Sequence, residues 1–523
     1  MHKRPLLCGL AVLFATVLVL TSFWLSMPAR ARANPGTRYV ATTGADTAGN
    51  TCTSASYPCQ TIQYAIGMAG PGDEIRVATG TYTATGTVAT IADDVTIVGA
   101  YGPPPSFEGP DPDLYQTILD AQWAGSVVSM TNAGDVVLQH LTITHGDGTG
   151  SCGTDSCGGG IYATNTSLHV QACVITNNVG GAAGMGMGGG IYAYNPTAGL
   201  LDVSESHVIS NTANANASSS MRGHGGGIYG RYGEVHLADN EVANNVGNAG
   251  YNGYGGGIRL RNVTSAQILT NTICGNKASV DDLCKGDGGG ASISQSSGIY
   301  LAGNRIEDNW TNPNRAGDGG GIHIAESDAH LSGNYIISNS SGAPNATRRG
   351  GGVCIESSKP VTLSNNLIAH NDAFIYGGGV YVGNAYSPAS QALLVNNTIV
   401  DNSSTGVVGW YYSDITLNNN LIAGHGAGLS NLDPLTGTIT ADSNLFWNSH
   451  DPITGTNAII EDPLLTADYH LQSGSPAVDK GLTIPWLTVD LEGNSRPSGT
   501  GYDIGAYEYY RRIFIPLVLK QYS

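Results

Sequence analysis

Short runs of alternating apolar and polar residues recur along most of this chain, and each run ends in asparagine, as in residues 235–245, 299–309 and 361–371. Alternation over so few residues is typical of β-strands with one buried face, not of helices. Two asparagines keep fixed places in the runs. The first recurs at Asn240, Asn271, Asn304, Asn334, Asn366, Asn397 and Asn420, and the second at Asn178, Asn211, Asn245, Asn276, Asn309, Asn339, Asn371 and Asn402.

A triple glycine marks the same repeat. It begins at Gly158, Gly188, Gly225, Gly255, Gly288, Gly319, Gly350 and Gly377, in steps of 27 to 37 residues. A unit of this length built only of strands does not close a core alone, but copies stacked about 4.8 Å apart give every strand a partner above and below. We therefore predict an all-β, right-handed parallel β-helix with three short strands per turn, the handedness following the preference of parallel connections.

Residues at one place in the repeat form rows along such a solenoid. We expect an inner row of Ile161, Ile191, Ile228, Ile258, Ile322, Val353 and Val380. We expect the asparagine rows at corners, where asparagine tolerates left-handed backbone and its amide can bond to the next copy. The glycines allow positive φ and close approach at a sharp bend.

The start of the chain has the pattern of a secretory signal over residues 1–33: Lys3 and Arg4, an apolar run, and an A-x-A site before Asn34. An uncleaved membrane anchor is the alternative. Residues 34–100 are expected to form an N-terminal cap and first turn, with helical spacing over 61–69 and a short strand over 74–78. Their phrases TIQYAI and GDEIRVATGTY resemble the N-terminal cap of pectate-lyase-like β-helix proteins, and a cap is needed to cover unpaired strand edges.

The regular repeats occupy residues 101–425 and also resemble the repeats of polymorphic outer membrane proteins. Residues 426–510 contain SGSPAVDKG and DIGAYE and resemble the choice-of-anchor Q domain, which implies a neighbouring signal for attachment to the cell envelope. We expect the charged residues of this region to form internal ion pairs that fix a cap: Asp479, Asp490, Arg496, Asp503 and Glu508. Residues 511–523 are either a sorting or attachment tag or an edge strand that closes the solenoid.

Charge and composition narrow the class of partner. Removing residues 1–33 takes away four basic residues and no acidic ones, so 18 basic and 40 acidic residues remain, a formal charge of −22. Nucleic acid is therefore excluded as an expected partner. Only 12% of residues are charged, and the polar surface suits an exported monomer that contacts a polysaccharide or a component of the cell envelope.

Cysteines fall in close pairs after the signal. In an exported chain the pairs Cys52–Cys59, Cys152–Cys157 and Cys274–Cys284 are expected to be disulfides that staple loops. Cys173 and Cys354 are expected to be buried members of residue rows. Histidines matched to a zinc motif are missing from the sequence pattern.

The residue before each triple glycine forms a row in which Asp287, Asp318 and Arg349 are consecutive. Stacked carboxylates repel unless a cation lies between them or one takes a proton. One hypothesis has Asp287 and Asp318 holding calcium and Arg349 abstracting a proton, with His323 close by. The alternative is that these are solvated turn residues whose charges offset one another.

The second residue after each triple glycine should point outward, because the residue before it points inward. This row contains Tyr162, Tyr192, Tyr229 and Arg259, which could stack on sugar rings. Stacked tyrosines are equally ordinary filler in a solenoid.

Two functions remain as hypotheses. The first is a secreted or cell-surface structural or carbohydrate-binding module without catalysis, with no cofactor required. The second is a polysaccharide lyase of the pectate-lyase-like kind, working by calcium-assisted β-elimination, or another glycan-degrading enzyme. The paired-aspartate and G-H-G phrases of polygalacturonases have only faint and reversed counterparts at 281–284 and 222–225, which argues against hydrolysis by that route.

Overall fold

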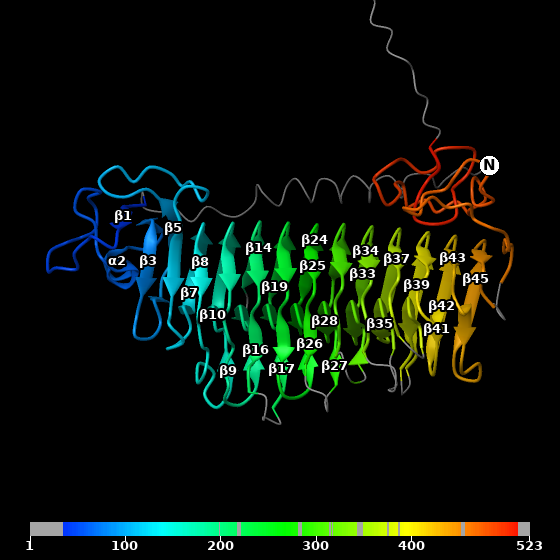
Figure 1. Ribbon diagram of the computed structural model, residues 1–523, viewed down its shortest axis with the longest axis horizontal. Helices are drawn as coiled ribbons and strands as arrows, with labels where there is room; N and C mark the ends of the chain where they lie inside the picture. Colours follow the sequence, from blue (N-terminus) through cyan, green and yellow to red (C-terminus); the bar gives the residue numbers. More distant parts are fainter. Residues whose placement is uncertain are drawn as a thin grey trace, which may run out of the picture.

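The computed structural model shows a single long solenoid of stacked parallel strands (Figure 1). The structure describes residues 35–510 apart from 198, 217–220, 281–284, 313–314, 316, 343–348, 374–375, 385–387 and 451–454. The expectations for the signal at 1–33, the tail at 511–523 and Cys284 lie outside the described residues. Among the described residues, no helix has the length and apolar character to cross a membrane.

One turn of the solenoid illustrates the repeat. It contains β31 (Gly317–Asp318), β32 (Ile322–Ala325), β33 (Ala329–Ser332) and β34 (Tyr335–Ile337). The last three are the strands that the alternating pattern predicts. The fourth, β31, has only two residues and lies directly before the triple glycine.

Each strand pairs in parallel with its counterparts in the turns above and below. Corresponding strands of successive turns pair in register, so that β32 lies between β28 (Ala291–Ser294) and β35 (Val353–Glu356). A 13-stranded sheet runs from β3 (Gly80–Thr83) to β46 (Leu445–Trp447), so stacked strands extend beyond residue 425. The two-residue strands form their own sheet: β9 (Ser156–Cys157), β12 (Gly186–Met187), β17 (Gly223–His224), β22 (Gly253–Tyr254), β27 (Gly286–Asp287) and β31.

The predicted inner row is confirmed. Ile161, Ile191, Ile228 and Ile258 pair in sequence along the solenoid, and each has no exposed surface. Together with the apolar residues of the other strands they form one continuous core from Val40 to Phe446. The fold is a parallel β-helix held by its interior ladders.

The asparagine rows also stack, and their amides bond from one turn to the next. Asn309 Nδ2 donates to Asn339 Oδ1 (2.9 Å), while the backbone N–H of Asn276 donates to Asn309 Oδ1 (3.0 Å). The left-handed backbone, however, belongs to the residue just before each asparagine, as at Gly303 and Asp308. The bend therefore comes one residue earlier than expected, which frees the asparagine side chain to point inward.

The triple glycines make the bend at which two strands of a turn meet. The first glycine has positive φ, +69° at Gly319. A Cβ on Gly320 would lie 2.4 Å from the carbonyl oxygen of Gly351 in the next turn. Stacked turns therefore approach too closely here for any side chain.

The two ends of the described chain are built differently. At the N-terminal end, α2 (Ile62–Met68) packs beside β1 (Thr37–Val40) and β2 (Asp73–Ala78), and Thr61 caps the helix by accepting from the N–H of Tyr64. The predicted helix and strand are thus confirmed.

The C-terminal region lies along the side of the last turns (Figure 1). Three corner asparagines hold it: Asn365 donates to Val489 O, Asn396 to Asp503 O and Asn419 to Leu482 O, over 2.6 to 2.8 Å. One of the expected ion pairs is present, because Arg496 Nη1 lies 2.6 Å from Glu508 Oε1 and neither side chain is exposed. The carboxylates of Asp479, Asp490 and Asp503 accept hydrogen bonds from backbone N–H groups and form no ion pair among the described residues. Arg496 Nη2 also donates to Asn365 Oδ1 (3.0 Å), so the same arginine joins the region to the flank of the solenoid.

Two of the expected disulfides, Cys52–Cys59 and Cys152–Cys157, are formed. The third expected disulfide, Cys274–Cys284, is not confirmed. Cys274 is a free cysteine, and Cys284 lies outside the described residues. Cys173 and Cys354 are free and buried, in agreement with their expected places in residue rows.

Candidate functional site

The two-residue strands before the triple glycines cover the outward-facing side chains of the strands that follow the glycines. Tyr192 and Tyr229 leave the main core as expected, but they join a separate buried cluster with Cys157 and Met187 from the two-residue strands. Tyr229 is 2% exposed and Arg259 is 6% exposed. The expectation of an exposed aromatic surface is therefore wrong. Alternation identifies the outer side of a strand, but not the strand that the glycine bend folds back over it.

Arg259 donates hydrogen bonds within this layer from two of its guanidinium nitrogens, while its buried Nε has no hydrogen-bond partner among the described residues. Its guanidinium donates to Ser292 Oγ, and also to Ser294 Oγ over 2.8 Å. Its Cζ lies 5.4 Å from the centre of the Tyr254 ring. Tyr162, at the end of the row, is the least covered of the four residues expected to bind sugar and stacks on Tyr192. A sugar-binding role for this row stays a prediction, and its burial argues against it.

The four residues expected to be catalytic do come together. Asp287 pairs with Asp318 on adjacent strands, and Asp318 bridges to Arg349 in the next turn. Arg349 donates from Nε to Asp318 Oδ1 (2.8 Å) and from Nη1 to Glu356 Oε1 (2.5 Å). Glu356 also contacts His323, with 3.2 Å between Oε2 and Nε2. We call these five residues the charged cluster.

Burial and neighbouring charges perturb the pKa values in the charged cluster. Burial raises the pKa of Asp287 to about 6, although the charge of His323 opposes this shift. Burial also disfavours the charged form of Glu356, but hydrogen bonding from His323 and the charges of His323 and Arg349 outweigh it and lower that pKa to about 2. Glu356 is therefore ionised, and the cluster contains more carboxylates than cations.

Arg349 is poorly suited to act as a base here. Burial lowers its pKa, but the charge of Asp318 and the hydrogen bonds to that carboxylate outweigh burial and raise it overall. An arginine that abstracts a proton must first be neutral, which this environment opposes. The catalytic and calcium-binding roles of Asp287, Asp318, Arg349 and His323 stay predictions, and the ion pairs favour a structural role.

A pocket that the sequence pattern does not indicate lies between the last turns and the C-terminal region. It has a volume of about 410 Å³. Its lining includes Trp447, which is 41% exposed, Tyr469 from the C-terminal region, and the polar residues Asp401, Asn448 and Asp462. We call it the flank pocket. Its residues come from three successive turns and a later segment, so no local motif could have found it.

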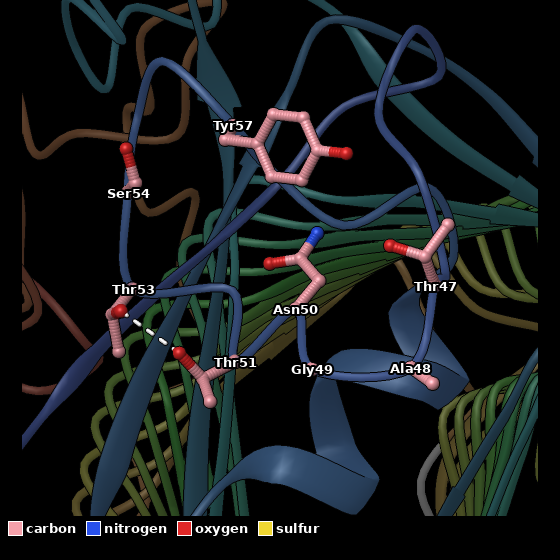
Figure 2. A pocket seen from close by; sticks show the side chains of 8 residues that line it. All are labelled: Thr47, Ala48, Gly49, Asn50, Thr51, Thr53, Ser54 and Tyr57. Atoms are coloured by element: carbon pink, nitrogen blue, oxygen red, sulfur yellow. Dashed lines mark hydrogen bonds between the residues drawn. The ribbon is translucent and has the colours of Figure 1, made fainter.

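A second pocket of about 440 Å³ lies in the N-terminal loop (Figure 2). Small polar residues and the exposed Tyr57 line it, and the hydroxyls of Thr51 and Thr53 bond to each other over 3.0 Å. The amide of Asn50 is already used by the backbone, because it donates to Ala45 O and accepts from the N–H of Cys52. The Cys52–Cys59 disulfide cross-links this loop.

Comparison with known proteins supports the class of fold. A family model described as "Right handed beta helix region" matches residues 219–387 and 351–463. The solenoid is therefore a right-handed parallel β-helix. No curated protein matches the chain.

Several solved structures align with most of the chain at low sequence identity. The complex of XylC with xylose aligns at 11% identity over 91% of this chain and 99% of its own, with a TM-score of 0.44. Pectate lyase Pel9A aligns at 11% over 92% and 98%, with a TM-score of 0.39. The A-module of Azotobacter vinelandii mannuronan C-5 epimerase AlgE6 aligns at 14% over 77% and 94%, with a TM-score of 0.35. Similarity at this level assigns no activity to the chain.

Proposed function

We propose that this protein is an exported, envelope-attached β-helix that binds a neutral glycan in the flank pocket and does not catalyse a reaction. The observation that carries the proposal is the pairing of an exposed indole ring, Trp447, with carboxylate and amide groups in one pocket. A flat aromatic face packs against the C–H groups of a sugar ring, while carboxylates and amides bond to its hydroxyls.

The charge of the flank pocket selects among glycans. Asp401 and Asp462 contribute carboxylates, and no lysine or arginine lines the described part of the pocket. The mature chain is also strongly acidic. An acidic polysaccharide would meet like charges, so a neutral one is the better fit.

Affinity electrophoresis of the mature protein through gels containing neutral or acidic polysaccharides tests this proposal. At least one neutral glycan should retard the protein, and Trp447→Ala should weaken that binding about tenfold, the loss expected when one aromatic contact is removed. Trp486→Ala is the matched control, because Trp486 is similarly exposed (47%) but lies outside the pocket. Retardation by none of the neutral glycans, or equal binding by both variants, would refute the proposal.

The convergence of Asp287, Asp318, Arg349 and His323 favours one second candidate, a calcium-assisted polysaccharide lyase. Incubation with acidic polysaccharides and calcium would then produce unsaturated sugars that absorb in the ultraviolet. Activity that Arg349→Ala abolishes would establish the lyase and overturn the non-catalytic assignment. The ion pairs of Arg349 lead us to expect no absorbance change.

A further inference from the structure

Beneath Arg349, three different metal-binding side chains meet on the outer face of two paired strands. His323 on β32 pairs directly with Cys354 on β35, and Glu356 follows two residues later on the same face. One ligand atom from each of the three lies within 4.8 Å of the other two. Zinc ligands stand about 3.5 Å apart around the ion, so small side-chain movements would bring all three into its coordination sphere.

The imidazole supplies a second, independent observation. His323 is 6% exposed, and its Nδ1 has no hydrogen-bond partner among the described residues. Its Nε2 already contacts Glu356. A buried nitrogen without a partner is costly, and coordination to a metal would satisfy it.

The surrounding charges attract a cation. Asp287, Asp318 and Glu356 are three carboxylates, and Arg349 is the one guanidinium that contacts them in the described residues. Arg349 is engaged by both Asp318 and Glu356. Asp287 interacts with His323 through its charge and makes no contact with Arg349 among the ion pairs described. Asp287 is therefore the one of these three carboxylates that no ion pair of the described residues neutralises.

We propose that His323, Cys354 and Glu356 form a binding site for a zinc-class divalent metal ion. The donor set decides the class of metal, because imidazole and thiolate suit zinc. Calcium takes six to eight oxygen ligands, which this site does not offer. On binding, the Cys354 S–H bond breaks, a metal–sulfur bond forms and the proton passes to solvent. The inference is independent of the proposed glycan binding.

Cobalt(II) titration of the mature full-length protein tests the site, because a cobalt–thiolate bond gives a charge-transfer absorption band. We expect one equivalent to produce the band and zinc to abolish it by competition. Cys354→Ser should lose the band, whereas Cys173→Ser should keep it, since Cys173 is another buried free cysteine that belongs to no such group among the described residues. Glu356→Gln keeps the thiol and should weaken metal binding at least tenfold.

Circular dichroism establishes that each variant is folded before titration. Absence of the band in the wild-type protein would overturn the proposal. Persistence of the band in Cys354→Ser would do so as well, because the metal would then be held by another thiol. If Cys354→Ser does not fold, Glu356→Gln decides the matter: unchanged affinity would refute the site.

Discussion

The asparagine ladder should respond strongly to loss of a single side chain in its middle. Asn309 has no exposed surface and makes four ladder hydrogen bonds through its amide. It donates to Ile273 O (2.8 Å) and Asn339 Oδ1 (2.9 Å), and it accepts from the backbone and side-chain N–H groups of Asn276. Asn309→Ala removes all four hydrogen bonds and leaves the buried backbone N–H of Asn276 without this acceptor.

The magnitude follows from these contacts. A typical buried hydrogen bond contributes about 1 kcal/mol net, so four lost bonds cost about 4 kcal/mol. Turns of a solenoid contact mainly their neighbours, so the loss should be local. A decrease of 4 kcal/mol in the free energy of local opening corresponds to roughly a thousandfold faster amide exchange.

Hydrogen exchange measured by mass spectrometry can resolve this effect turn by turn. We expect faster exchange in Asn309→Ala for peptides that cover residues 272–339, with the N-terminal turns unchanged. Asn457→Gly is the control, because it removes one exposed bond to Asp442 while glycine tolerates the φ of +49° at that position. Wild-type exchange rates around Asn276 and Asn339 in Asn309→Ala would show that the ladder does not hold the turns together.

Three further predictions concern the two ends of the molecule. Arg496→Met should destabilise the C-terminal region by about 3 to 5 kcal/mol, because the carboxylate of Glu508 would remain buried without its guanidinium partner. Limited proteolysis should then cut within residues 460–510 faster in this variant than in the control Arg305→Met, which breaks an exposed ion pair. Burial raises the pKa of Asp503 to about 6, so its contribution to stability is present below the unfolded pKa of about 3.9 and is lost as the pH rises through 6. Thermal unfolding should therefore show about 2 to 3 kcal/mol less stability at pH 7.5 than at pH 4 from this group, and Asp503→Asn should remove that part of the slope. Replacing both Cys52 and Cys59 with serine should cost the N-terminal loop about 2.5 kcal/mol, measured as faster exchange over residues 38–60, and unchanged exchange would show that the disulfide does not hold the loop.

Periodicity alone predicts most of the solenoid. The triple glycines and paired asparagines set the repeat length, and the alternation predicts which residues, such as Ile258, form the inner row. The same spacing brings Asp287, Asp318 and Arg349 onto neighbouring strands, since stacking turns a sequence period into a spatial row.

Features that depend on how the chain folds back are not visible in that periodicity. Tyr229 is buried because the two-residue strand before the triple glycine covers it, and nothing in the alternation marks that strand. The flank pocket combines Asp401 with Tyr469, and the C-terminal region bonds to asparagines more than 60 residues earlier in the chain. The sequence predicts Cys354 as a buried row member beside His323, but the meeting of their ligand atoms with the carboxylate of Glu356 depends on side-chain conformation.

Because the C-terminal region lies along the side of the solenoid, some turns contact it and the others do not. Its hydrogen bonds go to Asn365, Asn396 and Asn419, one corner in each of three successive turns. The turn before Asn365 also contacts the region, because the rings of His330 and Trp486 lie 6.1 Å apart and Tyr335 packs in the same hydrophobic cluster as Leu471 and Ile504. Whole repeats could therefore be gained or lost between Gly158 and Gly319 while the attachment of the C-terminal region stays the same. The length of the protein is in this sense adjustable during evolution or by design, whereas the turns that contact the C-terminal region must be kept.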